Sequence, residues 1–221
     1  MNRHGVPPLV QRGEASRGRK GTRPEIKVWS DFVCPYCFLA EGVLNEATRG
    51  LDVRVEWMPF ELRPYPEPTL RPEGEYLQTV WRRSVYPLAS QLGVEIRLPD
   101  VSPQPYSRAA HEGLLFAKQH GKAAEYADAV FRAFFQRSLD IGDMRVLQSI
   151  AQQIGLDGAA FAAALMDGRY TADHQASLAL ARRLGIRAVP TIVVGDELVV
   201  GMPDPVSLRR LLVQLGNTDT R

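Results

Sequence analysis

The sequence predicts an α/β protein: a mixed four-stranded sheet with helices on its faces, interrupted by an inserted all-helical subdomain. A strand–helix–strand pattern opens the chain, four or five helical segments without strands follow, and a helix–strand–strand–helix pattern closes it. Without the helical segments the order is β-α-β … α-β-β-α, and each of these elements can bury its apolar side against one shared sheet.

The first half of the sheet is predicted from a strand, a helix and a second strand. The strand covers Glu25–Ser30, and the helix covers about Pro35–Arg49, with Gly50 as its C-terminal stop. Apolar and polar residues then alternate over 51–58, which is the period of a half-buried strand. Because a helix joins the two strands, they should lie parallel. Five prolines make Pro59–Pro72 a stiff, extended connection.

A long helical section follows, and Pro87 should kink its first helix. Apolar residues recur at helical spacing through the section, and Asp143 is a good N-cap for one of the later helices. The later helices are predicted over Ser107–His120, around Ala127–Phe134, over Asp143–Gly155 and over Gly158–Met166.

The α/β pattern resumes after Gly168. A helix over Thr171–Leu184 leads to two short strands, which a Gly-Asp turn can join into an antiparallel hairpin. Asp204 can cap the last helix, with Pro205 at its first position. The two strands are predicted over Thr191–Val194 and Leu198–Gly201, and the last helix should end at Gly216.

Charge is distributed unevenly along the chain, whose net charge is +2. Residues 1–24 carry six basic residues and one acidic residue, so this segment has a charge of +5 and the remainder has −3. A mildly acidic folded part argues against nucleic-acid binding, and the segment 1–24 has too few apolar residues to fold by itself. The predicted division is a disordered basic leader (1–24), a first sheet half (25–72), an inserted helical subdomain (73–168), a second sheet half (169–216) and a tail (217–221).

No stretch of the chain reaches the roughly 18 consecutive apolar residues that a membrane span needs. The N-terminal segment also lacks the apolar core of a secretory signal. We therefore expect a cytoplasmic protein without a membrane partner, in a compartment where structural disulfides are rare.

The only two cysteines, Cys34 and Cys37, lie at the junction of the first strand and the first helix. Cys34 falls at the helix N-terminus, where unpaired N–H groups and the helix dipole favour a thiolate. Cys37 lies one turn later, close enough to form a disulfide, and Pro35 suits the first helical position. The pattern predicts thiol–disulfide exchange, with Cys34 as the exposed nucleophile and Cys37 as the more buried resolving thiol.

The cysteine pair could instead have a structural role or no chemical role at all. The pair could be half of a structural zinc site, but such a site needs four ligands, and the chain has no second cysteine pair and no closely spaced histidines. We therefore expect no metal. The pair could also be two inert core cysteines. The histidines of the chain are His4, His111, His120 and His174.

Val189-Pro190-Thr191, just before a predicted strand, is a second candidate site. By itself this motif is compatible with an ordinary turn that contains a trans proline, because only about 5–6% of X–Pro bonds are cis.

Taken together, these motifs resemble the DsbA family of thioredoxin-fold oxidoreductases over about residues 25–216. The shared features are Cys-Pro-x-Cys after the first strand, a helical insertion, and a late Val-Pro-Thr before a hairpin. Four stretches further resemble the FrnE-like branch of this family, namely Ser30–Pro35, Pro59–Leu62, Ser107–His111 and Gly185–Thr191.

The resemblance implies a thioredoxin fold and a protein thiol–disulfide oxidoreductase whose redox pair is Cys34 and Cys37. It also implies that Pro190 is cis and faces the Cys34 sulfur, that a substrate polypeptide pairs with the Val189 backbone, and that Thr191 starts the next strand. We expect no cofactor beyond the redox-active disulfide. The expected partners are protein thiols or disulfides, or glutathione as a candidate reductant, and the protein is expected to be a monomer or a homodimer.

Two alternative functions stay open. The family also includes glutathione-transferase kappa and hydroxychromene-carboxylate-isomerase branches, which are glutathione-dependent and act on small molecules. These branches typically have a serine where this chain has Cys34 and lack the second cysteine, so the sequence departs from them at both positions. The second alternative is a redox-controlled binding or chaperone module that does not turn over a substrate.

Tyr36 bears on the redox direction. Strongly oxidising DsbA proteins usually have a histidine at this position, which can stabilise the thiolate, whereas Cys-Pro-Tyr-Cys is the glutaredoxin-type motif. We therefore expect a potential closer to the glutaredoxin range of about −200 to −230 mV than to about −120 mV.

Four further sites have two interpretations each. Asp31 either caps the turn before Cys34 or relays protons there, and Glu61 either faces the active site or is an exposed loop charge. His111 either lines the substrate groove or occupies an ordinary position on an amphipathic helix. The aromatic cluster of Phe131, Phe134 and Phe135 either forms the core of the insertion or also walls the cysteines.

Overall fold

The computed structural model describes residues 25–218. The predicted leader 1–24 lies outside the described residues, as do the last three residues of the predicted tail 217–221. The first two tail residues belong to helix α9 (Pro205–Thr218). The prediction that Gly216 ends this helix was wrong, because a glycine stops a helix where its backbone turns left-handed, and here the helix continues through it.

The predicted mixed four-stranded sheet is confirmed, and its strand order is β2-β1-β3-β4. β1 (Glu25–Ser30) pairs in parallel with β2 (Arg54–Pro59), as expected for two strands that a helix joins. β3 (Thr191–Val194) runs antiparallel to β1 and forms a hairpin with β4 (Glu197–Val200). The thioredoxin-like arrangement therefore combines segments from both ends of the described chain.

β2 begins at Arg54, later than the alternating pattern predicted. The reason is local: the N–H of Leu51 donates a 2.9 Å hydrogen bond to the carbonyl of Thr48, so this residue belongs to the turn that ends the first helix. Its backbone N–H is therefore not available to the strand ladder.

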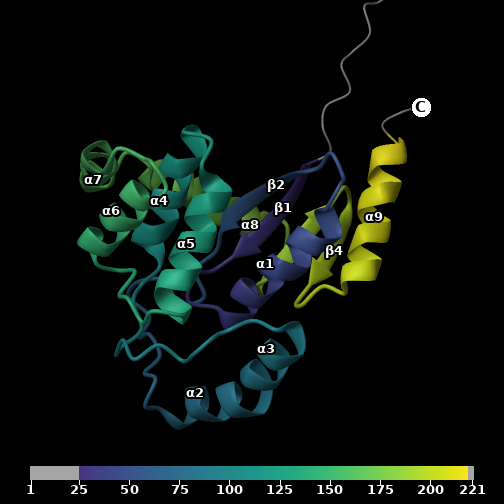
Figure 1. The fold of residues 1–221 in the computed structure, drawn as a ribbon. Coiled ribbons are helices and arrows are strands. Elements are labelled where there is room, and N and C mark those ends of the chain that lie inside the picture. The colour runs from purple at the N-terminus through teal and green to yellow at the C-terminus, as the bar shows by residue number, and fades with distance from the viewer. Residues whose placement is uncertain (1–24, 219–221) are drawn as a thin grey trace, which may run out of the picture.

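Helices cover both faces of the sheet (Figure 1). α1 (Pro35–Thr48) and α9 lie together on one face, and α8 (Thr171–Arg183) lies on the other. Successive side chains of β1 point to opposite faces, as the pleat of a strand requires. Val28 therefore joins the main core, whereas Trp29 packs with residues of α8.

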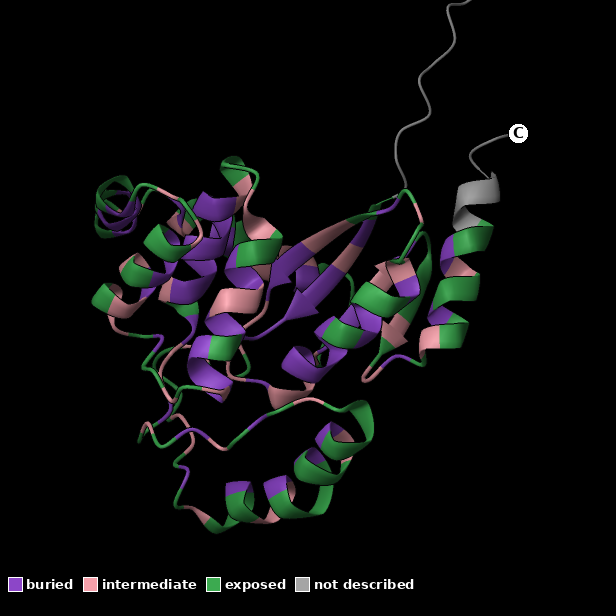
Figure 2. Cartoon of the chain, viewed as in Figure 1, coloured by how far each residue is buried: buried purple, intermediate pink, exposed green. Residues whose placement is uncertain are grey.

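The helical block lies between β2 and α8 in the chain. Its elements are α2 (Glu75–Val80), the π-helical turn η1 (Trp81–Val85), α3 (Tyr86–Leu92), α4 (Arg108–Gln119), α5 (Ala123–Phe135), α6 (Met144–Gln153) and α7 (Gly158–Met166). Figure 2 shows many buried residues in α5, whereas much of α2 and α3 is exposed.

The irregularity expected at Pro87 takes the form of the π-helical turn η1 directly before it. Proline cannot donate a hydrogen bond to the carbonyl four residues earlier, and its ring crowds that carbonyl. A widened turn accommodates both constraints, so the chain continues from α2 through η1 into α3.

One continuous apolar core joins the helical block to the sheet half that carries the cysteines. The ring of Phe131 lies 5.0 Å from the ring of Phe32 and 5.8 Å from that of Phe38, measured between centroids. Phe135 stacks on Phe38 at 5.7 Å. The predicted aromatic cluster therefore forms core and also walls the segment around the cysteines.

Candidate active site

Cys34 is the N-cap residue of α1, and Pro35 is the first residue of that helix. The N–H of Cys34 donates a 3.0 Å hydrogen bond to the carbonyl of Asp31, which closes the turn between β1 and α1. No side-chain hydrogen bond caps the helix, and the N–H of Cys37 donates a 3.1 Å hydrogen bond to the carbonyl of Cys34. Cys34 therefore lies at the positive end of the helix dipole.

Both cysteines are free thiols, and both are largely buried. The prediction of an exposed nucleophile needs correction, since Cys34 is only 4% exposed, and Cys37 is 0% exposed. The sulfur of Cys34 is reached instead through a pocket that it lines. The two thiols therefore differ in access to this pocket rather than in exposure at the surface.

The pKa of Cys37 is raised well above its usual value, mainly because burial disfavours the thiolate. The neighbouring Cys34 thiol raises the pKa of Cys37 further, whereas the backbone of Asp31 and the hydroxyl of Ser30 act in the opposite direction. Cys37 is therefore protonated at neutral pH, which fits the resolving thiol of the pair.

The second predicted motif, Val189-Pro190-Thr191, lies next to Cys34. The Val189–Pro190 bond is cis, as the resemblance implied, and the Cys34 thiol donates to the Val189 carbonyl at 3.7 Å. Thr191 begins β3, opposite Trp29 of β1, and is buried. Its hydroxyl donates to the Ala188 carbonyl at 2.7 Å, so its side chain braces the turn rather than facing the pocket.

The pocket beside Cys34 has a volume of about 300 Å³. Pro35, Tyr36 and Val189 contribute to one side of it, and the face of α2 and η1 contributes another. Its wall is mainly apolar, with a few polar groups from the loops. These polar residues include Asp31, Arg63, Thr69, Gln104 and Ser107.

His111 does not line this pocket, contrary to one of its two predicted roles. It is 1% exposed on α4, and its ring lies 4.8 Å from that of Phe32. Its Nε2 is 3.0 Å from the carbonyl oxygen of Phe60 and 3.6 Å from Oδ1 of Asp31. His111 is therefore part of a buried polar network next to the active-site turn.

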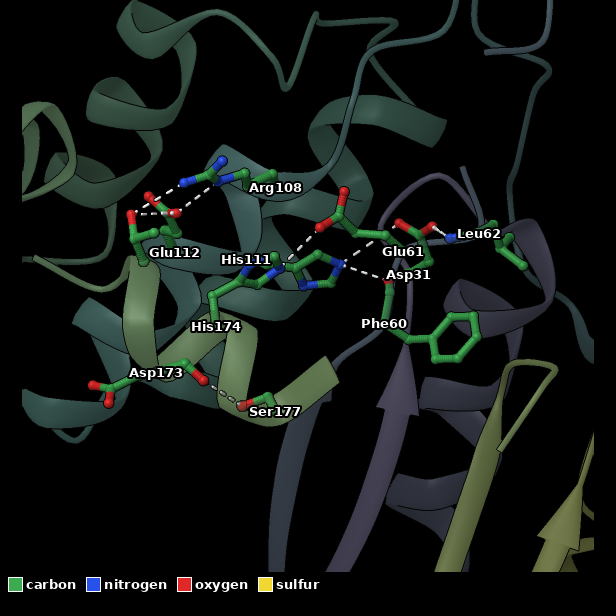
Figure 3. A network of polar contacts seen from close by, with 11 residues as sticks. Asp31, Phe60, Glu61, Leu62, Arg108, His111, Glu112, Asp173, His174 and Ser177 are labelled. Carbon is green, nitrogen blue, oxygen red and sulfur yellow. Dashed lines mark hydrogen bonds and ion pairs between the residues drawn. The ribbon is translucent and has the colours of Figure 1, made fainter. Parts of the chain in front are cut away.

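Figure 3 shows this network, in which the two imidazole rings lie side by side, with His111 directed toward Asp31 and His174 toward Glu61. Asp31 accepts hydrogen bonds from the N–H groups of Val33 (3.4 Å) and Leu62 (2.7 Å), so it acts as a cap for two loops. Glu61 is not an exposed loop charge: its side chain is 5% exposed, and its Oε1 lies 3.1 Å from Nε2 of His174.

Sequence reasoning did not single out His174, which is fully buried on α8. A signal was present, because His174 and the buried Ala181 are seven residues apart and so share one helix face. That spacing alone does not identify the carboxylate that a buried histidine would meet.

Within residues 25–218, no three His, Cys, Asp or Glu side chains are grouped so that they could hold a metal ion. None of the helices in this range combines the length and the apolar composition that crossing a bilayer requires.

A sequence profile described as DSBA-like thioredoxin domain matches residues 25–213 of the chain. A curated relative, the uncharacterized protein YwbO of Bacillus subtilis (strain 168), is 47% identical over 178 residues, covering 80% of this chain and 89% of that protein.

Three solved structures are similar in fold. A probable DsbA oxidoreductase from Streptomyces coelicolor has a TM-score of 0.76 and 22% identity, covering 88% of this chain and 90% of that one. A 2-hydroxychromene-2-carboxylate isomerase has a TM-score of 0.72 and 18% identity, covering 89% and 99%. The cytosolic disulfide reductase DsbM from Pseudomonas aeruginosa with GSH has a TM-score of 0.69 and 20% identity, covering 87% and 99%.

Proposed function

This chain belongs to the family of DSBA-like thioredoxin domains, and we propose that it is a protein thiol–disulfide oxidoreductase with Cys34 and Cys37 as its redox pair. One observation carries the proposal. The Cys34 sulfur lies at a helix N-terminus, lines a pocket and is 3.7 Å from the Val189 carbonyl, while Cys37 follows one helical turn later. This arrangement presents the Cys34 thiol to a substrate and leaves the Cys37 thiol to resolve the resulting mixed disulfide.

In the proposed reaction, the Cys34 thiolate attacks one sulfur of a substrate disulfide. The substrate S–S bond breaks as a Cys34–substrate disulfide forms, and the other substrate sulfur leaves as a thiolate that takes up a proton. Cys37 then loses its proton and attacks the Cys34 sulfur, which releases the first substrate sulfur as a thiolate and closes the Cys34–Cys37 disulfide. Two electrons pass from the dithiol to the substrate, and the reverse sequence oxidises a substrate dithiol.

The environment of Cys37 suits this order of events. Burial and the adjacent Cys34 thiol both raise the pKa of Cys37, so it does not compete as the first nucleophile. Once Cys34 is bound in the mixed disulfide, its charge no longer opposes ionisation of Cys37. The resolving step is thereby favoured after the first step.

A trapping experiment tests the proposal. Cys37→Ala removes the resolving thiol, so mixed disulfides at Cys34 should accumulate in cells and appear as a ladder of protein adducts on a non-reducing gel. Cys34→Ala is the matched control and should give no adducts. The purified wild type should also reduce insulin in the presence of a dithiol, unlike either variant. A chain that forms no protein adducts and does not reduce insulin would contradict the proposal.

A second candidate is a glutathione-dependent transferase or isomerase that acts on a small molecule. It is supported by the likeness in fold to an isomerase and to a reductase solved with GSH, and by a pocket of about 300 Å³ next to Cys34. It predicts glutathione adducts alone in the trapping experiment, and activity that survives Cys37→Ala. We propose that the thiol–disulfide exchange of the first candidate takes place in the cytoplasm, with glutathione as a candidate reductant.

A further inference from the structure

A buried polar network lies directly next to the active-site turn (Figure 3). The rings of His111 on α4 and His174 on α8 lie with centroids 6.0 Å apart. Each histidine faces one carboxylate: His111 faces Asp31 at 3.6 Å, and His174 faces Glu61 at 3.1 Å. The two carboxylates follow the adjacent ends of β1 and β2, and none of the four side chains is more than 5% exposed.

Asp31 is the member of this network that reaches the thiol site. Its Oδ2 accepts the N–H of Leu62 at 2.7 Å, its Oδ1 accepts the N–H of Val33 at 3.4 Å, and its backbone carbonyl accepts the N–H of Cys34 at 3.0 Å. All four of these residues line the same pocket. The Asp31 side chain therefore holds the turn that carries Cys34 against the loop that follows β2.

The charge of Asp31 has a consequence for Cys34. A carboxylate that lines the same mainly apolar pocket as the sulfur opposes a second negative charge there. His111 moderates this effect, because its Nε2 faces the carbonyl oxygen of Phe60, which only accepts, and so carries a hydrogen. The same N–H group lies 3.6 Å from Asp31 and presents the positive end of its dipole to the carboxylate.

We propose that Asp31 is a positioning residue that sets the thiol–disulfide equilibrium of the Cys34–Cys37 pair, with His111 moderating its charge. The inference rests on the proposed oxidoreductase function. A thiolate exists only in the reduced form, so a neighbouring negative charge destabilises that form and favours the disulfide. In the reaction concerned, the dithiol loses two electrons and two protons as the Cys34–Cys37 bond forms, and one glutathione disulfide becomes two glutathione thiols.

The test is equilibration of the full chain with defined mixtures of glutathione and glutathione disulfide, followed by acid quenching and measurement of the oxidised fraction. Asp31→Asn keeps the size and one acceptor oxygen but removes the charge. It should lower the equilibrium constant for oxidation by at least about tenfold, which corresponds to a potential about 30 mV more oxidising.

His111→Leu removes the N–H group and leaves the carboxylate, so it should raise the same constant by about twofold or more. Asp157→Asn is a matched control, because Asp157 caps the distant α7 by accepting from the N–H groups of Ala159 and Ala160. It should leave the equilibrium constant unchanged. Thermal unfolding is measured for each variant, because loosening of the fold by itself would not shift the two network variants in opposite directions.

The proposal is overturned if Asp31→Asn stays within about twofold of the wild type, or if both network variants shift the equilibrium in the same direction. If Asp31→Asn does not fold, His111→Leu decides, and an unchanged or lowered constant overturns the proposal. A wild type that forms no Cys34–Cys37 disulfide in any glutathione mixture would instead contradict the proposed function.

Discussion

Replacing Glu41 with Gln is expected to remove a pH-dependent loss of stability. Glu41 lies on α1, four residues after Cys37, and is 8% exposed. Burial and the charge of Asp128 raise the pKa of Glu41 to about 8, and Arg132 opposes this shift. Arg132 offsets it only in part, since its guanidinium already forms a 2.7 Å ion pair with Asp128.

The magnitude follows from the two protonation equilibria. Glu41 is protonated in the native state at neutral pH, whereas in the unfolded chain it titrates near 4.5. Between pH 4.5 and about 8 the native state holds a proton that the unfolded state has lost, so the free energy of unfolding falls as the pH rises. Each pH unit costs about 1.4 kcal/mol, which sets an upper limit of roughly 3 kcal/mol at pH 7 and 5 kcal/mol at pH 8.

Glu41→Gln keeps the shape of the side chain and removes the titrating group. The free energy of unfolding in urea, measured with excess reductant, should increase relative to the wild type by about 2–4 kcal/mol between about pH 5 and pH 8. Glu46→Gln, exposed on the same helix, controls for a general loss of negative charge and should show no such trend. Parallel pH curves for wild type and Glu41→Gln would refute the reasoning, because Glu41 would then carry the same charge in both states.

Three further predictions concern the redox motif, the core and a helix cap. Tyr36→His should shift the redox potential from the wild-type value, expected at about −200 to −230 mV, toward about −120 mV, because a histidine can stabilise the neighbouring thiolate. Equilibration with glutathione measures this potential, and an unchanged value would contradict the role assigned to Tyr36. Phe131→Ala should lower the free energy of unfolding in urea by about 3–5 kcal/mol, because this ring is 0% exposed and packs against the rings of Phe32 and Phe38. A loss below about 1 kcal/mol would mean that the aromatic cluster is dispensable. Asp204→Ala should lower the free energy of unfolding by about 1 kcal/mol, because Asp204 loses the 2.7 Å N-cap hydrogen bond that it accepts from the N–H of Ser207. Insulin reduction should stay intact. Reduced turnover by the folded variant would contradict the assignment of Asp204 to the helix cap alone.

Several elements were predictable because their signals act over a few residues. β3 and α7 lie at the predicted residues, and α1 begins at Pro35, directly after Cys34. Asp143 accepts the N–H of the second residue of α6, as expected for an N-cap. Capping, proline placement and apolar periodicity all depend on neighbours within one or two helical turns, so a sequence alone contains this information.

The cysteine pair was also predictable as a thiol–disulfide motif, from its spacing and its position between a strand and a helix. Its relation to Val189 was suggested only by the family resemblance. The Cys34 thiol and the Val189 carbonyl are 155 residues apart in the chain and 3.7 Å apart in the structure. No local pattern predicts that contact, because it depends on β3 pairing with β1 across the whole helical block.

Only the tertiary structure decided what the buried polar residues do. In the sequence, His111 and His174 are single histidines on amphipathic helices, and Asp31 and Glu61 are single acids after strands. Their burial and pairing arise because α4 and α8 pack where β1 and β2 end. The charge and contacts of a side chain depend on every segment that the fold places around it, whereas helix and strand formation depend mainly on the residues nearby in the chain.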